Sequence, residues 1–339
     1  MDGVEQTMAD DEWRRWIAEN LLIGEPSERL IEVLKSKGFS GEEAARELQA
    51  AEASPYVKAA SAVRNGLKDR DWLLGVYRKN NRLRSDSGEI ERRHRLSRHG
   101  LLHPYYSSNR PVVIAGMLDD WPALRKWNLD YLVQTFGDRE VEVRVPRTAD
   151  EKTDSDASGQ WISRIKFETF VDTMRTGAET NDSHLTARHA STNWKALSRL
   201  WDDIVPVPEY LSGDRPAGVL WMAPRGATVP FHHNLANSLI AHVLGRTRAK
   251  LAPSWDLPLM RNTLHSFSRV NGRVEPHNPR PPHDEPQIYE LVLEPGEVLF
   301  LPVGWMHFIE AIETSVTVTF TNFVFDNDFA SFYTTYGRV

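Results

Sequence analysis

Two short segments carry the residues best suited to chemistry in this chain of 339 residues. The first contains His232, His233 and Asn234, and the second is Gly304-Trp305-Met306-His307. Imidazole nitrogens, together with carboxylate or carbonyl oxygens, are typical ligands of non-haem Fe(II). Such a site needs three ligands on one side of the metal and open positions on the other. The two segments therefore predict a metal site that forms where distant parts of the chain meet.

The spacing within the first segment supports this prediction. His232 and Asn234 are separated by one residue, and residues i and i+2 of an extended segment project to the same side. His307 lies 73 residues after Asn234 (307 − 234) and would come from a returning strand. We therefore expect the metal ligands to be His232, Asn234 and His307. For Asn234 two interpretations remain open, a weak ligand through its amide oxygen or a side chain outside the coordination sphere.

Short strands must position these residues. Beyond Gly218, strand-like segments follow one another closely and are joined by connections that contain Gly and Pro. They cover residues 219–223, 238–244, 248–251, 289–293, 298–301 and 315–323. Upstream, residues 111–116 and 140–145 have the patterns of a buried and a half-buried strand. This spacing favours a mainly β jelly roll, the double-stranded β-helix, over an alternating helix–strand sheet.

The N-terminal part has a helical pattern instead. Ser27 would cap a first helix, and Ser40 with Glu43 forms a capping box for a second. This helical pair, at about residues 27–50, resembles a ubiquitin-associated hairpin. Two roles remain open for it, an accessory cap on the main domain or a recruitment module.

A charged segment separates the two parts of the chain. Residues 78–98 are dense in Arg, Lys and Glu and are typical of a solvated helix or a linker. The predicted organisation is thus a helical region, residues 1–80, followed by a barrel domain, residues 85–339. We expect any homodimer to form through the N-terminal helices.

Composition excludes several classes of function. Charged residues make up 26% of the chain and the net charge is −6, without long runs of one sign, which argues against nucleic acid or membranes as the main partner. The absence of cysteine excludes disulfides and thiolate metal sites and favours a reducing compartment. No apolar run reaches the length of a membrane span, and the N-terminus lacks a signal-peptide pattern. We therefore expect a cytoplasmic location.

Four segments together resemble the JmjC-type, cupin-like (factor-inhibiting-HIF-like) branch of the Fe(II)/2-oxoglutarate oxygenases. Besides the segment around His232, residues 111–123 resemble the entry motif "P-v-i-i-x-G-x-x-x-x-W-P-A". Residues 304–307 are similar to "G-W-W-H", and residues 315–323 to the closing strand "S-i-s-v-t-f-x-N-F". The resemblance covers about residues 85–325. It implies a double-stranded β-helix, Fe(II) and 2-oxoglutarate as cofactors, and hydroxylation of a peptide or small natural product.

The resemblance also shows where this chain departs from the family. The first and third metal ligands fall on His232 and His307, but the family's Asp falls on Asn234. The Lys that binds the far carboxylate of 2-oxoglutarate falls on Thr247 (247 − 232 = 15). Asn234 brings no negative charge to the metal, and Thr247 cannot pair with a carboxylate as Lys does. The residues expected to line the 2-oxoglutarate pocket, or the pocket of a replacement ligand, are Val229, Ser238, His242 and Thr247.

His242 lies on the same strand as Ser238. It shares one face of its strand with Ser238 and Ile240, so it should point into the barrel near Thr247. Two interpretations remain open, a core histidine bonded to a backbone carbonyl or a polar group that replaces an altered ligand.

Three readings of the function follow from these departures. The first is an atypical metal oxygenase that oxidises a peptide or small molecule with weak or no use of 2-oxoglutarate. The second is a catalytically degenerate protein that uses the barrel only for binding. The third is an ordinary hydroxylase in which another basic residue, such as Lys250 or Arg188, replaces the missing Lys. The sequence alone does not assign catalytic residues beyond the metal ligands.

Overall fold

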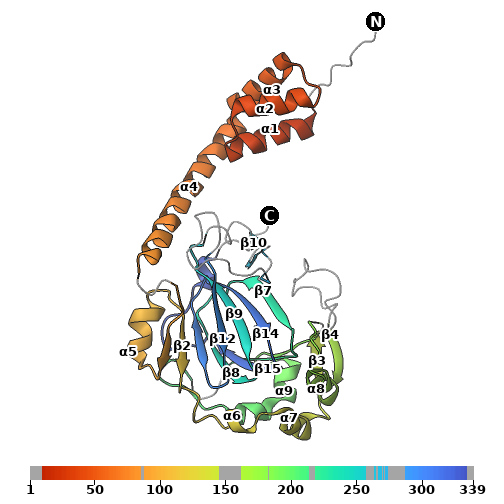
Figure 1. Cartoon of the computed structure of the whole chain (residues 1–339), viewed down its shortest axis with the longest axis vertical. Coiled ribbons are helices and arrows are strands. Elements are labelled where there is room, and N and C mark those ends of the chain that lie inside the picture. Colours follow the sequence, from red (N-terminus) through yellow and green to blue (C-terminus); the bar gives the residue numbers. More distant parts are fainter. Residues whose placement is uncertain are drawn as a thin grey trace. The chain divides into compact units, whose positions relative to one another are not determined.

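The structure, a computed structural model, contains two compact units, and Figure 1 labels their elements. The first unit ends at Tyr77 and the second begins at Arg78. The sequence pattern places this division slightly later, at residues 80–85. The described residues are 10–84, 88–144, 162–181, 183–213, 218–256, 263–264, 266–268, 270, 272–273 and 287–333.

The N-terminal region is helical. Its helices are α1 (Asp11–Ile23), α2 (Ser27–Ser36), α3 (Gly41–Ala53) and α4 (Pro55–Arg82). The predicted pair at residues 27–50 corresponds to α2 and α3, and α1, which we did not predict, packs against them. The buried apolar residues that join these three helices are Ile17, Leu30, Leu34, Phe39, Ala44 and Leu48. No helix among the described residues is both long and apolar enough to cross a membrane.

The two predicted helix caps have different outcomes. The Ser40 hydroxyl accepts a hydrogen bond from the Glu43 backbone N–H at 3.1 Å, which confirms Ser40 as the N-cap of α3. Ser27 is not a cap. Pro26 occupies the N-cap of α2, and the Ser27 hydroxyl instead donates to Glu52 at 2.8 Å.

The second unit contains a seven-stranded sheet with the order β1-β2-β13-β8-β15-β6-β5. The parallel pairing of β1 with β2 lies at one edge, and the other pairings in this sheet are antiparallel. Its strands are β1 (Arg92–His94), β2 (Val112–Ala115), β5 (Leu185–Ala187), β6 (Val219–Ala223), β8 (Ser238–Leu244), β13 (Val298–Leu301) and β15 (Ser315–Phe320).

A six-stranded antiparallel sheet, with the order β10-β11-β7-β14-β9-β12, faces the first. Its strands are β7 (Thr228–His232), β9 (Thr247–Ala252), β10 (Thr263–Leu264), β11 (Phe267–Ser268), β12 (Tyr289–Leu293) and β14 (Met306–Ala311). From β6 to β9 and from β12 to β15, successive strands alternate between the two sheets. This alternation is the double-stranded β-helix, so the predicted mainly β fold class with a helical N-terminal region is confirmed.

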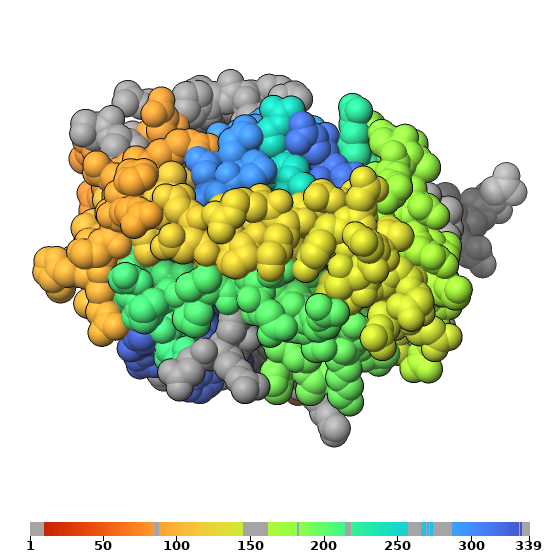
Figure 2. Space-filling view, turned by 90° about the horizontal axis from the view of Figure 1, so that it is seen from below, coloured from red at the N-terminus to blue at the C-terminus, as the bar shows by residue number. Residues whose placement is uncertain are grey.

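Helices cover the outer face of the larger sheet. Leu239, Ala241 and Val243 of β8 point to this side and pack in one apolar cluster with α6, α7 and α8. Figure 2 shows this face of the molecule, where yellow and green residues from the segments around α6, α7 and α9 lie together. We did not predict these short helices. The short helices are α6 (Ala123–Lys126), α7 (Leu129–Phe136), α8 (Phe167–Arg175) and α9 (Thr192–Ala196). The remaining elements of the second unit are α5 (Arg98–Leu101), η1 (Leu102–Tyr106), β3 (Glu140–Arg144), β4 (Ile162–Lys166), η2 (Ser198–Asp203) and η3 (Ala330–Phe332).

The space between the two sheets has its own apolar cluster. Ile240 from the larger sheet packs there with Ala249 and Leu251 from the smaller one. Because side chains alternate along a strand, Ser238 and His242 share the inner face of β8 with Ile240. The interior of the barrel is therefore apolar at its centre and contains a few buried polar side chains.

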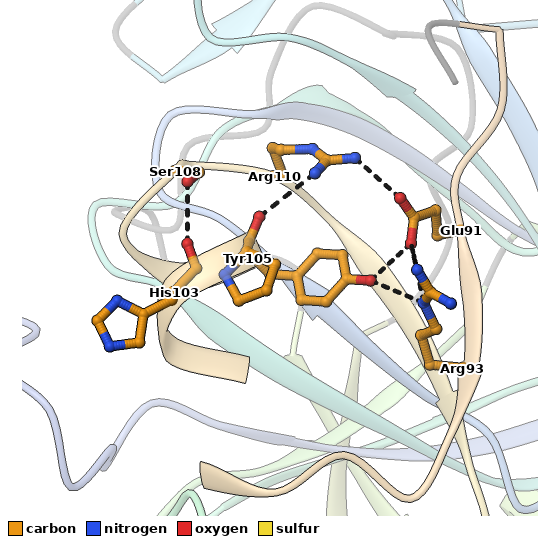
Figure 3. Close-up of polar contacts among 7 residues, drawn as sticks. Glu91, Arg93, His103, Tyr105, Ser108 and Arg110 are labelled. Atoms are coloured by element: carbon orange, nitrogen blue, oxygen red, sulfur yellow. Dashed lines mark hydrogen bonds and ion pairs between the residues drawn. The ribbon is translucent and has the colours of Figure 1, made fainter. Parts of the chain in front are cut away.

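The prediction of a helix or linker at residues 78–98 was wrong in part. Helix α4 continues to Arg82, but Arg92–His94 forms strand β1. The carboxylate of Glu91 fixes this edge, because it accepts hydrogen bonds from Arg93 at 2.9 Å, Tyr105 at 2.6 Å and Arg110 at 3.0 Å (Figure 3). A cluster of charged side chains thus joins β1 to the segment before β2.

Candidate metal centre

His232 and His307 meet inside the barrel. They are register partners on the neighbouring antiparallel strands β7 and β14. Their ring centroids lie 4.0 Å apart, and the two ring planes are inclined by 51°. The pairing of the strands therefore brings together two imidazoles that are 75 residues apart in the sequence (307 − 232).

Both imidazoles are oriented in the same way. His232 Nδ1 lies 2.9 Å from the Pro230 carbonyl oxygen, and His307 Nδ1 lies 3.1 Å from the Trp305 carbonyl oxygen. A carbonyl oxygen can only accept, so each Nδ1 carries the proton and donates it. Each Nε2 is then the nitrogen with the lone pair. Metal-binding histidines usually have this second interaction, which fixes the tautomer and the ring.

Burial keeps His307 neutral. Its side chain is 3% exposed, and burial lowers its pKa well below the ordinary histidine value. The neighbouring His232 lowers the pKa of His307 further, because two positive charges at this distance would repel. Burial also lowers the pKa of His233. Its ring packs against the Tyr333 ring instead, with the ring centroids 5.6 Å apart. At neutral pH His307 therefore retains a lone pair for a ligand.

Asn234, in the first of the two segments, contacts both the neighbouring strand β8 and the second segment. Its side-chain Nδ2 donates to the hydroxyl of the buried Ser238 at 3.0 Å. Its backbone carbonyl accepts from the Gly304 N–H at 3.2 Å. The amide oxygen Oδ1 is the part of the side chain able to serve as a ligand, and it carries no full charge.

The donor set fits a divalent metal only in part. Two neutral imidazoles with oriented Nε2 atoms suit Fe(II), but the described residues contain no cluster of three His, Cys, Asp or Glu side chains that could hold an ion. In the family, a carboxylate would balance the charge of the metal. Asn234 replaces that charge with a dipole, so any metal held here has weaker electrostatic support.

The loop before His307 is held by two asparagines that sequence reasoning missed. Asn237 Oδ1 accepts from the Val303 N–H at 2.8 Å. Asn109 Nδ2 donates to the Val303 carbonyl at 2.9 Å, and Asn109 Oδ1 accepts from the Trp305 ring N–H at 2.9 Å. Because the Trp305 carbonyl orients His307, these contacts support the histidine pair indirectly. No local motif reveals them, since Asn109 is 196 residues from Trp305 (305 − 109).

A β-bulge places Val229 inside the barrel. His232 pairs with His307, but Val229, three residues earlier, pairs with Ile309, only two residues later. Pro230, which has no N–H to donate to the sheet, lies in this irregularity. Val229 and Ile309 are opposite each other, and Ile309 packs against the apolar cluster between the sheets. Val229 therefore contributes an apolar wall where the family has a Thr.

His242 and Thr247 form a second polar group at the other end of the barrel interior. His242 Nε2 donates to the Gly245 carbonyl at 2.8 Å, and Nδ1 accepts from the Thr247 hydroxyl at 3.0 Å. Burial lowers the pKa of His242 to about 4, so the ring is neutral near pH 7. The geometry matches the interpretation of a core histidine bonded to a backbone carbonyl. The Thr247 hydroxyl uses its proton in the same contact.

The two polar groups are separated along the strands. His307 pairs with Leu251, whereas Thr247 pairs with Ala311 at the other end of β14. Four residues of strand span about 13 Å. The first group is His232, Asn234, Ser238 and His307, and the second is His242 and Thr247. Ile309 and Ala249, which are opposite each other in the sheet, lie between the two groups, so the expected pocket residues fall into two bonded sets. That both sets line one ligand pocket stays a prediction.

Neither alternative anchor faces the position of Thr247. Lys250 is on β9 between Ala249 and Leu251, which both point into the barrel, so its side chain lies on the opposite face. There, Lys250 Nζ is 3.9 Å from a Glu290 carboxylate oxygen. Arg188 is exposed directly after β5. The residues at this end of the barrel therefore do not fit the distal carboxylate of 2-oxoglutarate in the way that a Lys would.

The fold and the histidine pair define a cupin-like protein of the JmjC type. Residues 99–331 match the family described as the cupin-like domain, which is more than half of the chain. The chain therefore belongs to the JmjC-type, cupin-like family, whose members generally use Fe(II) and 2-oxoglutarate.

Several similar proteins have names that refer to demethylation. The chain is 30% identical over 241 residues to lysine-specific demethylase JMJ30 of Arabidopsis thaliana. The matched region covers 68% of this chain and 54% of that protein. It is 28% identical over 225 residues to lysine-specific demethylase 8 of Xenopus tropicalis, covering 64% of this chain and 48% of that protein. It is also 24% identical over 237 residues to human HSPB1-associated protein 1, and this match covers 64% of this chain and 48% of that protein. The chain thus spans about half the length of these curated relatives.

Proposed function

We propose that this protein is an atypical JmjC-type oxidoreductase that holds a divalent metal, Fe(II) by family, through His232 and His307, with Asn234 as a neutral third ligand. Its substrate would be a peptide or a small natural product. The observation that carries the proposal is the pair of inward-facing imidazoles, each with Nδ1 bonded to a carbonyl two residues upstream. Fe(II) at such a site supplies the oxygen-activating chemistry of the family.

The protein's own residues would bind and orient the reactants. The carbonyls of Pro230 and Trp305 hold the two imidazoles in the ligand tautomer, and burial keeps His307 unprotonated. Ser238 fixes the amide of Asn234, so that Oδ1 remains for the metal. Because these three donors are neutral, we expect weaker metal binding than at a site with a carboxylate.

The proposal includes impaired use of 2-oxoglutarate. A Lys at position 247 would form a charge-assisted bond to the distal carboxylate, roughly twice as strong as a neutral hydrogen bond. Thr247 has no charge, and its hydroxyl is bonded to His242. A dicarboxylate would have to break this buried contact without gaining an ion pair. A 2-oxo acid without a distal carboxylate, or no 2-oxo acid at all, suits the site better.

Metal binding by the purified protein tests the proposal. Mn(II) can stand in for Fe(II) in anaerobic calorimetry, and we expect one site per chain that His307→Ala abolishes. The exposed His189 provides a matched control, because His189→Ala should leave the titration unchanged. A parent protein that binds no Mn(II), Fe(II) or Zn(II) at millimolar concentration would refute the proposed metal centre.

The second candidate is a binding protein without turnover. The replacement of the carboxylate by Asn234, together with the neutral Thr247, favours it. Oxygen consumption by the Fe(II)-loaded protein distinguishes the two candidates. Consumption that depends on His307 and responds to a 2-oxo acid supports the oxidoreductase, whereas tight metal binding without any consumption supports the binding protein.

A further inference from the structure

Helix α4 exposes an unusual amount of apolar surface. Eleven large hydrophobic residues are exposed among the described residues, and six of them lie on α4. All six precede Arg78 and so belong to the first unit. They are Tyr56, Val63, Leu67, Trp72, Leu73 and Tyr77. A soluble surface normally spreads such residues, so their concentration on one helix indicates an interaction surface.

Most of these residues follow a heptad spacing. Tyr56, Val63, Arg70 and Tyr77 recur every seventh residue, and Ala59, Gly66 and Leu73 follow the first three of them by three residues. Alternate steps of three and four place all seven on one side of the helix, which we call the α4 seam. Each seam residue is exposed. This spacing is typical of a helix that packs lengthwise on another helix.

The size of the α4 seam suits a dimer. Tyr56 is 86% exposed, Val63 68% and Tyr77 55%. Large aromatic side chains bury roughly 150–250 Å² each, so the seam with the adjoining Leu67 presents on the order of 600 Å². Stable interfaces bury upwards of about 1,200 Å² in total, or about 600 Å² from each partner, so two such seams reach the lower end of that range. A second α4 would supply a surface of the same length and spacing.

The sequence of the seam favours an antiparallel arrangement. In a parallel pair each residue would face its own copy. Arg70 would repel the Arg70 of the second copy, and the small Ala59 and Gly66 would face small residues and leave gaps in the interface. An antiparallel pair can set large residues against small ones, with Val63 opposite Gly66 and Arg70 opposite Ala59. It also keeps the two guanidinium groups apart.

We propose that α4 forms an antiparallel two-helix interface with a second copy of this chain, so that the protein is a homodimer. The interface is the α4 seam, and it does not involve the metal centre. This proposal is therefore independent of the proposed function.

Light scattering after size-exclusion chromatography of the full chain tests the proposal. We expect a dimer for the parent and a monomer for Val63→Glu. The dissociation constant of the dimer should rise on the order of 100-fold or more, because two buried charges replace apolar contacts. Trp72 is the matched control. It is 72% exposed on the same helix but lies outside the seam, so Trp72→Glu should remain dimeric. Circular dichroism checks that both variants keep the parent's helicity.

Cross-linking tests the orientation, and the chain has no cysteine to interfere. A mixture of Ala59→Cys and Arg70→Cys chains should form a disulfide between the two variants, whereas Ala59→Cys alone should not. A monomeric parent overturns the proposal, as does a dimer that Val63→Glu leaves intact. Efficient cross-linking of Ala59→Cys to itself would replace the antiparallel interface with a parallel one.

Discussion

Asn234 and Thr247 remove one negative and one positive charge that the family's Asp and Lys would bring to the barrel. Neither replacement leaves a buried polar group without a partner. Asn234 donates to Ser238, and Thr247 donates to His242. An unsatisfied buried group costs about 1–3 kcal/mol, so these local contacts make the neutral interior stable. The substitutions are thus part of two bonded pairs.

Restoring the carboxylate should strengthen metal binding. We expect Asn234→Asp to raise the affinity for Mn(II) by about tenfold or more, equivalent to about 1.4 kcal/mol, because a negative ligand balances the ion's charge. Calorimetry measures the change, and Asn234→Gln is the neutral control. Equal affinities of the parent and Asn234→Asp would mean that position 234 does not face the metal.

Restoring a cation at position 247 should change only the affinity for 2-oxoglutarate. Thr247→Lys should raise the affinity for 2-oxoglutarate and leave that for a 2-oxo acid without a distal carboxylate unchanged, since only the former can pair with Lys. Competition calorimetry of the metal-loaded protein measures both. Tight binding of 2-oxoglutarate by the parent would contradict the impaired use that we propose.

His242 should make stability depend on pH. Its pKa is about 4 in the folded protein and about 6.5 when unfolded, so the unfolded state binds more protons between these values. The contribution to stability is therefore present above pH 6.5 and is lost as the pH falls towards 4. Between pH 7 and pH 5 the expected loss is about 2 kcal/mol. Urea unfolding should show that His242→Gln has a shallower dependence on pH than the parent, and equal slopes would contradict the assignment.

Strand pairing and one loop position the histidine pair of the proposed metal centre. The register of β7 with β14 sets the distance between the imidazoles. The loop of residues 302–305 turns the chain into β14 and is held by Asn109 and Asn237. Asn109 adopts a φ of +50°, which Asn tolerates better than most residues. The histidines are thus positioned by backbone contacts outside the motifs that contain them.

Removal of the Asn109 side chain should test this support. We expect Asn109→Ala to lower the free energy of unfolding by about 1–3 kcal/mol, because Val303 and Trp305 lose a partner and Ala is strained at this φ. Metal affinity should fall by roughly 10–100-fold, as is usual when a ligand loses its supporting contact. Urea unfolding and calorimetry measure the two effects. The exposed Asn80 is the control, and Asn80→Ala should change neither quantity.

The two compact units have separate hydrophobic clusters, which should respond separately to mutation. Leu34 is fully buried among α1, α2 and α3, and Leu251 is fully buried between the sheets beside His307. Replacing either by Ala should cost about 2–5 kcal/mol in its own unit. Each core therefore offers a way to perturb one unit alone.

The effect on the metal centre distinguishes the two cores. Leu34→Ala should reduce the helical signal or its melting temperature while the affinity for Mn(II) stays at the parent value. Leu251→Ala should lower both the stability of the barrel and the metal affinity, because its side chain packs beside His307. Circular dichroism and calorimetry on the same samples provide the comparison. A loss of metal binding in Leu34→Ala would show that the units are energetically coupled.

Several strands and the two candidate ligand histidines could be predicted from local sequence signals, but β7 and β14, the strands that carry these histidines, were not among the predicted ranges. Strands such as Ser238–Leu244 and Tyr289–Leu293 were predicted with their exact bounds, because alternation and flanking turn residues are local signals. His232 and His307 stood out because each lies in a motif of several residues. The short helices α6 to α9 were missed, since segments of four to nine residues have too few turns for a clear helical period.

How the polar residues of the barrel interior divide into groups depends on the folded chain. His242 and Thr247 share the barrel interior with Asn234 and Ser238, yet strand register separates the two groups by about 13 Å. The same register turned Lys250 away from the interior and joined Asn109 to Trp305 across 196 residues (305 − 109). Side-chain period is a local property, but register depends on contacts between strands that are distant in sequence. For this reason the sequence could name the candidate site residues, whereas the folded chain shows which of them lie together.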